Sequence, residues 1–545
     1  MVQLVGKMEA LETMTTVAFS PNANSGEKAP FHKRLKAAFG VPEQRRYFGV
    51  YLAGKMIGLL AVIAIAYVFM KFIGDKALAQ DATGAVPAPF TGDDIINPLN
   101  TVWVLVTAFL VFLMQAGFMM LEAGFARSRE TVNVLQECIV DTCLCGLLFW
   151  AFGFAFMFGE GNGIIGHNYF FLGNATATYG TTGVAFLAFF LFQFAFADTC
   201  STITSGAMVG RTGFKGDLLY SFVVSGFIYP ILGHWVWGPG GWLATMDTPF
   251  RDFAGSTVVH TVGGMVAFTG AVVLGPRLGR KFKRDGGGMF PGHDMTIAAV
   301  GAVILWFGWY GFNPGSTLSA MDFEGIGRVA TNTTLAACAG GLTAMAWIYP
   351  RVKKWDMGIT INGLLGGLVA ITAPCYWVSP LGAIAIGAIA GVVIVLGIDF
   401  IEWLRVDDPI GAVAVHGIAG IFGTIAVGLF ASGDFGIPGP TGADTSTLVT
   451  GLFYGGGTDQ LLAQLKGSLT ITLAALAVGF VLMYAVKATR TLRVSEAGEL
   501  EGIDIHEHGG PAYHMEFGMG SSYSTSPIAE GPSSKGVKEP VLTDR

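Results

Sequence analysis

The chain has 545 residues, of which 52% are hydrophobic and 13% charged, against about 25% charged residues in ordinary soluble domains. Its 78 glycines are roughly twice the usual share, and its formal net charge is −6. This composition excludes a soluble multidomain enzyme and is typical of a polytopic helical membrane protein, in which small residues let helices approach closely. The lack of a basic patch in the sequence argues against a nucleic-acid partner.

The first 79 residues have the features of a targeting segment. Residues 1–47 are polar and basic near their end, an apolar run follows at about 56–70, and Ala77-Leu78-Ala79 comes after it. A basic region, an apolar core and an A-x-A motif in this order predict a signal peptide that is cut after Ala79. An uncleaved signal anchor is the alternative, although the apolar run is short for a membrane span.

Eleven apolar segments, each long enough to cross about 30 Å of hydrocarbon, follow a polar stretch at 80–98. They predict an all-α polytopic membrane domain over residues 95–490. The segments lie near 101–123, 138–158, 181–204, 217–237, 256–275, 295–312, 329–348, 358–375, 381–403, 411–432 and 467–486.

The positions of Lys and Arg in the short connections indicate the orientation of these segments. If the first segment starts outside, the inner connections carry thirteen Lys and Arg, and the outer connections carry only Arg251, Arg328 and Lys466. We therefore expect a multi-pass protein of the inner or plasma membrane, with its mature N-terminus outside and its C-terminus in the cytoplasm. In this orientation we expect residues 491–518 to form a cytoplasmic regulatory tail. The Ser/Pro-rich residues 519–545 are expected to form a disordered tail.

The six cysteines all fall in apolar stretches and lack metal-type spacing. We expect them to be small buried hydrophobic residues, with no metal or other cofactor bound.

Two of the apolar segments share a local pattern that indicates internal duplication. Residues 257–275 and 412–430 each place a Val-His pair early, with a glycine four residues after the histidine, and they are the fifth and tenth segments. Because five is odd, two five-helix units would run in opposite senses through the membrane. This is the five-plus-five inverted repeat of many transporters, whose working site lies at the midplane.

The histidines of these two segments, His260 and His416, lie within apolar helices, where a charged side chain costs about 2.5–3.5 kcal/mol. A single such histidine is most often a neutral residue that donates to a carbonyl between helices. Two at equivalent positions of a repeat favour a function, such as passing a proton or lining a narrow polar path.

Trp237 and Asp252 flank the connection between the fourth and fifth segments, at the outer side of the membrane. A carboxylate near an aromatic rim attracts small cations, and an indole face can hold one by cation–π attraction. Each residue also has a structural interpretation, because Trp237 fits an interfacial aromatic belt and Asp252 fits a helix N-cap.

Several motifs, in order along the chain, resemble the ammonium transporter family, which includes methylammonium permeases and Rhesus proteins. The resemblance covers roughly 420 residues and favours the ammonium transporter branch. It rests on "FLMQAGFMMLEAGFARSRETVNVL", "FQFAFADTCSTITSGAM", "HWVWGPGGWL", "DFAGSTVVH", "GWYGFNPGS", "RVDDPIGAVAVHGIAGIFG" and "LRVSEAGELEGIDIHEHGGPAY".

The resemblance implies an outer recruitment site for ammonium, and for methylammonium as its analogue, made by Trp237, Phe196 and Ser316. It also implies a gate of two stacked rings, Phe196 and Phe312, below that site.

The resemblance further implies that His260 and His416 are a twin-histidine pair in a hydrophobic pore and that Asp252 shapes the vestibule. Ammonium would cross the pair largely as ammonia, because an apolar passage penalises the charged form. The family also implies a transporter rather than an enzyme, a homotrimer in the lipid bilayer, and a PII-type regulator docking on the cytoplasmic face.

Three positions depart from the family pattern. Asp198 stands where a small apolar residue is usual, Gly210 replaces a common acidic residue, and His506 stands where plant members carry a regulatory threonine. Three other functions stay open from the sequence: a membrane haem protein with His260 and His416 as axial ligands, an ammonium sensor, and a Rhesus-like path for neutral gas.

Overall fold

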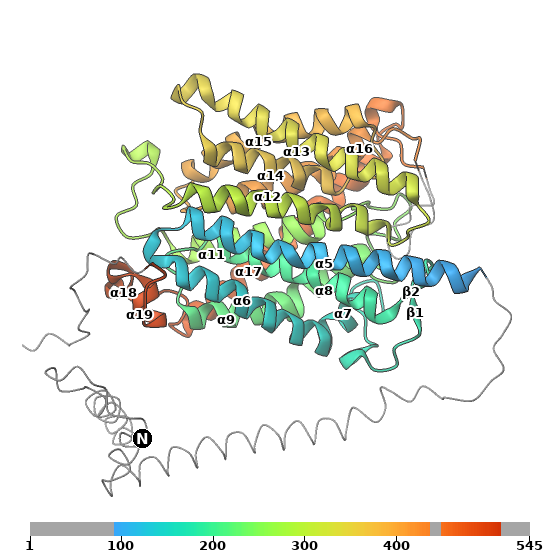
Figure 1. The fold of residues 1–545 in the computed structure, drawn as a ribbon, viewed down its shortest axis with the longest axis horizontal. Helices are drawn as coiled ribbons and strands as arrows, with labels where there is room; N and C mark the ends of the chain where they lie inside the picture. The colour runs from blue at the N-terminus through green and yellow to red at the C-terminus, as the bar shows by residue number, and fades with distance from the viewer. Residues whose placement is uncertain (1–91, 436–447, 514–545) are drawn as a thin grey trace, which may run out of the picture. The chain divides into compact units, whose positions relative to one another are not determined.

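The structure, a computed structural model, describes residues 92–435 and 448–513. The expected targeting segment at 1–79 and the expected disordered tail at 519–545 lie outside these residues. The described chain is a bundle of long helices that run side by side (Figure 1).

Fifteen α-helices are described, and short π-helical and 3₁₀ turns interrupt or connect them. The α-helices are α5 (Asp93–Phe125), α6 (Thr131–Leu148), α7 (Phe154–Phe158), α8 (Phe186–Gly206), α9 (Phe214–Val223), α10 (Tyr229–Trp237), α11 (Val262–Leu274), α12 (Met295–Phe312), α13 (Phe323–Val352), α14 (Met357–Thr372), α15 (Pro380–Trp403), α16 (Ala419–Phe430), α17 (Asp459–Ala488), α18 (Glu496–Glu501) and α19 (Ile503–His508). The π-helical turns are η3 (Phe149–Gly153), η5 (Val224–Ile228), η6 (Ser256–Thr261) and η9 (Val413–Ile418).

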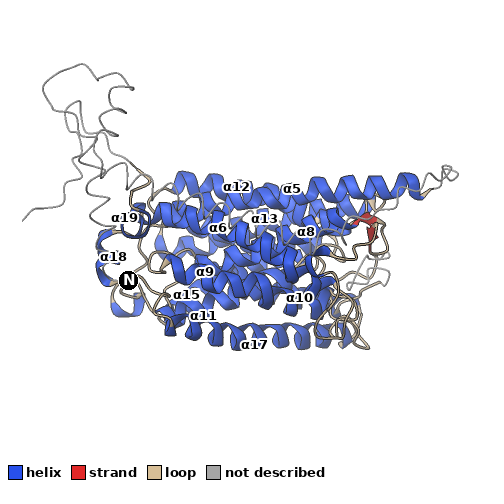
Figure 2. Ribbon diagram, turned by 90° about the horizontal axis from the view of Figure 1, so that it is seen from below, coloured by secondary structure: helices blue, strands red, loops and turns tan. Residues whose placement is uncertain are grey.

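The remaining elements are short. They are the 3₁₀ turns η2 (Ser128–Glu130), η4 (Phe170–Leu172), η7 (Lys283–Asp285), η8 (Pro314–Thr317) and η10 (Leu452–Tyr454), and the antiparallel two-residue strands β1 (Thr178–Tyr179) and β2 (Val184–Ala185). Figure 2 shows this strand pair at one end of the bundle and α18 and α19 at the other.

Each of the eleven apolar segments predicted from the sequence falls largely on helical residues, although the one predicted at 181–204 becomes helical only at Phe186. Among the described residues, nine helical segments are long and apolar enough to cross a membrane. The other two predicted segments, 329–348 and 358–375, fall on the 30-residue α13 and on the shorter apolar helix α14. The expectation of an all-helical polytopic membrane fold is therefore confirmed.

Four of these helices begin at a side-chain cap, which satisfies backbone N–H groups that the first helical turn leaves without a partner. Asp294 accepts hydrogen bonds from the N–H groups of Thr296 and Ile297 at the start of α12. Asp322, Asp356 and Ser379 do the same for α13, α14 and α15.

Glycines let the helices pack backbone to backbone, as the composition suggested. A Cβ on Gly124 of α5 would lie 2.5 Å from the backbone nitrogen of Ala298 on α12. A Cβ on Gly340 of α13 would lie 2.4 Å from the carbonyl oxygen of Gly363 on α14.

The two histidine-bearing helices cross at such contacts. A Cβ on Gly264, four residues after His260, would lie 2.3 Å from the backbone nitrogen of Gly417 in η9. A Cβ on Gly420, four residues after His416, would lie 2.4 Å from the carbonyl oxygen of Ser256 in η6. The glycine of each repeated pattern thus packs against the π-helical turn of the other helix.

The C-terminal segment packs against the end of the bundle where α6 begins. Asp504 accepts a hydrogen bond of 2.9 Å from the backbone N–H of Asn133, and His508 Nε2 lies 2.8 Å from Asn133 Oδ1. Arg129 donates to the carbonyl of Leu500.

Two details refine the sequence analysis. At Gly210, where the resemblance implies an acidic residue, the carboxylate of Glu130 lies 2.7–2.8 Å from the position that a Cβ would occupy. A nearby carboxylate therefore fills the space. The expectation that all cysteines are buried is wrong for Cys143 and Cys338, which are exposed on the outer faces of α6 and α13.

We predict that Gly264→Ala lowers the thermal unfolding midpoint of the detergent-purified protein. The added methyl group would force α11 away from η9, and overpacking of this kind costs about 1–3 kcal/mol. Gly327→Ala on α13 is the matched control, because nothing lies within 4 Å of its Cβ position. If the two variants had equal unfolding midpoints, the close contact between Gly264 and η9 would be contradicted.

Candidate functional site

The two buried histidines meet at the crossing of their helices. His416 Nδ1 lies 3.2 Å from His260 Nδ1, and the rings are nearly parallel, with centroids 5.2 Å apart. His260 is fully buried and His416 is 6% exposed. The pairing of His260 and His416 that the family resemblance implies is confirmed.

The Nδ1–Nδ1 contact restricts the protons of the pair. A hydrogen bond needs one donor and one acceptor, so one neutral ring carries its proton on Nδ1 and the other on Nε2. His260 Nε2 is buried and has no hydrogen-bond partner among the described residues. The pair thus holds one shared proton and offers a further ring nitrogen to an incoming group. Two rings hydrogen-bonded to each other leave no room for a haem between them.

A carboxylate positions the π-helical turn that holds His260. Asp252 is fully buried and accepts hydrogen bonds of 2.8–2.9 Å from the backbone N–H groups of Gly255, Thr257 and Val258. Gly255 has φ +115°, a conformation that residues with a side chain rarely adopt. Burial raises the pKa of Asp252 to about 6, although the backbone N–H groups act in the opposite direction.

The same arrangement recurs at His416. Asp408 accepts hydrogen bonds of 2.8–3.1 Å from the backbone N–H groups of Gly411, Ala412 and Val413, and Gly411 has φ +82°. Burial raises the pKa of Asp408 to about 6 as well. The two histidine turns are therefore built in the same way.

An ion-pair network joins the end of α11 to the segment just before η9. Arg277, just after α11, donates from its backbone N–H, Nε and Nη2 to the carboxylate of Asp407, at 2.8–2.9 Å. Arg211 donates to the carbonyl of Asp407. Burial acts to raise the pKa of Asp407, but the Arg277 and Arg211 guanidinium groups outweigh it and hold the pKa below its usual range.

Aromatic rings extend the histidine pair on both sides. On one side, Phe312 stacks on His260 at 5.4 Å, with Trp309 beside both at 5.2 and 5.7 Å. On the other side, the Phe118 ring centroid lies 6.3 Å from that of His416. Trp309 is fully buried and donates from Nε1 to Thr372 Oγ1 at 2.9 Å, which fixes its indole against His260.

The two phenylalanines expected to form a gate are in contact. Phe196 of α8 stacks on Phe312 of α12, with ring centroids 4.0 Å apart and an interplanar angle of 24°. Trp237 meets Phe196 edge to face at 6.1 Å. Six rings thus form a continuous series, which we call the ring row: Trp237, Phe196, Phe312, His260, His416 and Phe118.

Trp237 is 6% exposed and donates from Nε1 to the carbonyl of Asp252 at 2.8 Å, so it is not a residue of a surface belt. The backbone and side chain of Asp252 thereby hold both the first ring of the row and the turn of His260. Ser316, the third expected recruitment residue, is half-buried and donates from Oγ to the carbonyl of Phe312 at 2.8 Å.

Asp198 is fully buried on α8, with Gln115 of α5 and Thr142 of α6 beside its carboxyl group. Further carboxyl groups are buried in the same part of the bundle: Glu122, Glu137, Asp141 and Asp217. Among the described residues, however, no set of three or more His, Cys, Asp or Glu is arranged to hold a metal ion.

Sequence reasoning missed Phe118, Trp309 and Asp408. A signal for Asp408 was present, because "DFAGSTVVH" (252–260) and "DPIGAVAVH" (408–416) share the spacing Asp, Gly three residues later and His eight residues later. The two aromatic residues carry no such signal, since both helices are rich in apolar side chains.

Comparisons with known proteins agree on one family. The Ammonium Transporter Family matches residues 102–513. The ammonium transporter Amt2 of Archaeoglobus fulgidus is 44% identical over 426 residues, which cover 76% of this chain and 88% of that protein. A putative ammonium transporter of Synechocystis is 44% identical over 467 residues, covering 84% of this chain and 95% of that protein.

Solved structures give the same result. A protein described as a sensor Amt protein superposes with a TM-score of 0.69 at 36% identity, covering 76% of this chain and 99% of that chain. Mep2 of Candida albicans superposes with a TM-score of 0.67 at 26% identity, covering 75% and 89%.

We predict that Asp408→Ala lowers the thermal unfolding midpoint more than Asp356→Ala does. The first change leaves three buried N–H groups without an acceptor, at about 1–3 kcal/mol each. The second change removes Asp356, an exposed helix cap that accepts one backbone N–H, and should cost about 1 kcal/mol. Asp408→Asn, which keeps one acceptor oxygen, should lie between wild type and Asp408→Ala. If both alanine variants lowered the unfolding midpoint equally, Asp408 would not have the proposed role of positioning the turn of His416.

Proposed function

The chain belongs to the ammonium transporter family, and from this premise we propose that the ring row is the path by which it moves ammonium across a membrane. It is a multi-pass membrane protein and a transporter rather than an enzyme. The observation that carries the proposal is the buried hydrogen bond between His260 and His416 within an otherwise aromatic series.

The proposed topology has eleven spans in a five-plus-five inverted repeat, with the N-terminus of the transport domain outside and the C-terminus inside. The excess of Lys and Arg in alternate connections supports this orientation. The matching Asp, Gly and His positions in the fifth and tenth spans support the repeat, since each half contributes one histidine. The N-terminal segment 1–79, transport domain 95–490, tail 491–518 and terminal segment 519–545 remain the proposed organisation.

Ammonium recruitment is assigned to Trp237, Phe196 and Ser316 at the outer end of the ring row. An aromatic face attracts a cation with up to about 2 kcal/mol once water is excluded. The Ser316 hydroxyl has acceptor capacity left after donating to Phe312, so it can accept from an ammonium N–H. Asp252 holds Trp237 in place through its carbonyl and shapes this vestibule.

The gate is the stacked pair of Phe196 and Phe312. At a centroid distance of 4.0 Å the two rings are in contact, so a molecule can pass only when one of them rotates aside. Passage between two apolar rings removes water from the substrate and makes the charged form costly.

The histidine pair provides the exit for the proton. Ammonium passes a proton to the ring nitrogen Nε2 that has no partner, the Nδ1 proton of that ring moves to Nδ1 of the other ring, and a proton leaves from the Nε2 of that second ring. Ammonia continues along the apolar path. Potassium, which has no proton to give, keeps its charge and is rejected.

We assign the assembly and its regulation from the family resemblance alone. The proposed state is a homotrimer in the bilayer with one path per subunit, and a PII-type protein is the proposed cytoplasmic partner.

A sensing function is a second candidate, because a structural relative is described as a sensor Amt protein. The docked C-terminal helices α18 and α19 offer a place for a signal to originate. Flux through the purified protein distinguishes the two functions, since a sensor need not transport.

We predict that the His260→Ala/His416→Ala double variant conducts potassium, because the cation no longer has to lose a proton. Solid-supported-membrane electrophysiology on proteoliposomes, comparing ammonium, methylammonium and potassium, measures this. His293→Ala, a half-buried loop histidine outside the ring row, is the control and should behave as wild type. Unchanged ammonium currents without any potassium current in the double variant would refute the relay.

We predict that Trp237→Leu raises the half-saturating ammonium concentration by about 5- to 30-fold, the equivalent of about 1–2 kcal/mol of cation–π attraction. Trp237→Phe keeps an aromatic face, so its half-saturating ammonium concentration should rise less. Trp235→Leu, two residues away with its indole on the carbonyl of Ile164, serves as the control. An unchanged half-saturation in Trp237→Leu would favour a path that takes up neutral ammonia alone.

A further inference from the structure

Five carboxyl groups are buried together in the bundle, and none of them belongs to the ring row. We call them the acid series: Glu122 of α5, Glu137 and Asp141 of α6, Asp198 of α8 and Asp217 of α9, each at most 2% exposed. Helix α6 packs against the other three helices (Figure 1). All five residues lie in helical segments that are apolar enough to cross a membrane, where ionisable side chains are costly and usually functional.

The acid series is not neutralised by neighbouring cations. The charged groups that interact most strongly with Glu122, Glu137 and Asp141 are other carboxyl groups. Both side-chain oxygens of Glu122, Asp141 and Asp198 lack a hydrogen-bond partner among the described residues. Carboxyl groups packed in this way cannot all be ionised, because their like charges repel and nothing compensates the lost hydration. Some of the five groups therefore hold protons, and a protonated carboxyl group can donate to its neighbour.

Four members of the acid series follow one another from the middle of α8 to the start of α6. The carboxyl group of Asp198 lies beside Thr142, the residue after Asp141 in α6. The carboxyl group of Asp141 lies beside that of Asp217 on α9. Glu137 is four residues before Asp141, on the same face of α6, and its charge also interacts with that of Asp217. Each group thus has another within reach of its proton.

The acid series ends at the docked C-terminal segment. Glu137 Oε1 accepts from Asn133 Nδ2 at 2.9 Å, and Asn133 Oδ1 lies 2.8 Å from His508 Nε2. The exposed Glu507 of α19 is close enough to Glu137 for their charges to interact. Figure 1 shows α18 and α19 at the end of the bundle where α6 begins. A proton on Glu137 is therefore close to water on the proposed cytoplasmic side.

The other end of the acid series lies behind the ring row. Asp198 is beside Gln115 of α5, whose amide nitrogen is buried without a hydrogen-bond partner. Gln115 is three residues before Phe118, so the two side chains share a face of α5, and the Phe118 ring lies 6.3 Å from that of His416. On α8, Asp198 is two residues after Phe196 of the gate. The acid series thus begins about one helical turn from the ring row.

From these features we propose that the acid series conducts protons from the histidine pair to the cytoplasm. The proton that leaves the second histidine ring binds a carboxylate oxygen of Asp198, each carboxyl group passes a proton to the next, and Glu137 releases one to water. One proton enters and one leaves, so the series regains its starting charge, and one positive charge crosses with each ammonia. This use of the path rests on the proposed function, because the histidine pair supplies the proton.

Infrared spectroscopy of the full-length protein in proteoliposomes tests the path without ammonium. Only protonated carboxyl groups show the carboxylic C=O stretching band, so Asp198→Asn and Asp217→Asn should each remove part of it. Transfer of the wild type into heavy water should shift the band, because protons in the acid series exchange with the solvent. Glu137→Gln should slow this shift, since it interrupts the cytoplasmic end of the path.

Glu130→Gln is the matched control. Glu130 is also buried, at 1% exposed, near the start of α6, but the Arg127 guanidinium neutralises its charge. This variant should keep both the wild-type band and the wild-type rate of exchange. A wild-type band that does not shift in heavy water would overturn the proposal, because a static set of buried carboxyl groups conducts nothing.

The charge moved per nitrogen tests the use of the path. This ratio is the solid-supported-membrane current divided by the uptake of radiolabelled methylammonium into the same proteoliposomes. Asp198→Asn should lower the ratio, because the amine then crosses without its proton. Asp198→Glu, which keeps a carboxyl group, and Glu130→Gln should both retain the wild-type ratio.

Two results separate the failure of this proposal from that of the proposed function. A wild-type ratio of charge to nitrogen in Asp198→Asn would overturn the path while leaving ammonium transport intact. A lack of methylammonium uptake by the wild type would count against the transport mechanism, whereas the infrared band and its exchange would still report on the acid series.

Discussion

The hydrogen bond between His260 and His416 is the interaction on which the rest of the site depends, and it exists because two helix backbones touch. The histidines are 156 residues apart in the chain, yet their Nδ1 atoms lie 3.2 Å apart. Only glycines at the crossing, Gly264 and Gly420, allow this approach. In the interior of a membrane domain an imidazole without a partner is costly, and the Nδ1 atoms of the two rings satisfy each other, which leaves His260 Nε2 without a partner among the described residues.

That crossing requires irregular backbone inside the bundle, which must not leave polar groups unpaired. The structure solves this in the same way twice. Asp252 and Asp408 each accept three backbone N–H groups at the start of a π-helical turn, and each is followed by a glycine with positive φ. The Arg277–Asp407 pair then ties the end of α11 to the segment before η9. Asp252, Asp408 and the Arg277–Asp407 pair thus hold the backbone that positions the mostly apolar rings of the ring row.

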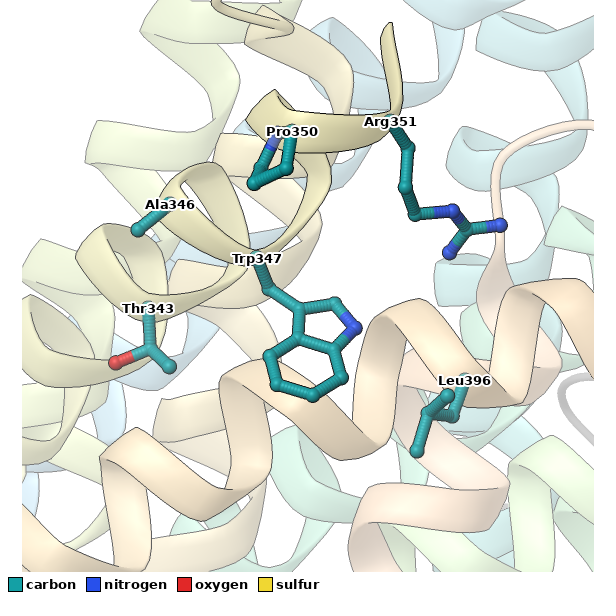
Figure 3. A pocket seen from close by; sticks show the side chains of 6 residues that line it. All are labelled: Thr343, Ala346, Trp347, Pro350, Arg351 and Leu396. Carbon is teal, nitrogen blue, oxygen red and sulfur yellow. The ribbon is translucent and has the colours of Figure 1, made fainter.

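Tryptophan shows how burial assigns different roles to one residue type. Trp309 is completely buried and supports His260, whereas Trp237 is nearly buried and begins the ring row. Trp347 is 47% exposed and lies on a lateral groove beside Arg351 (Figure 3). Each role follows from the residues that surround the indole. The apolar character of the helices alone does not distinguish the three tryptophans.

The amino-acid sequence by itself determined the membrane class, the approximate positions of the long apolar helices and the choice of His260 and His416 as a candidate pair. Segment length, hydropathy and the spacing of His and Gly are local properties that folding does not change. Tertiary structure alone decided that the two imidazoles share a hydrogen bond, that Phe118 and Trp309 belong beside them, and that Asp408 plays the part of Asp252. These relations depend on which faces of distant helices meet, and an apolar helix gives no local signal of its contact face when nearly all of its faces are apolar.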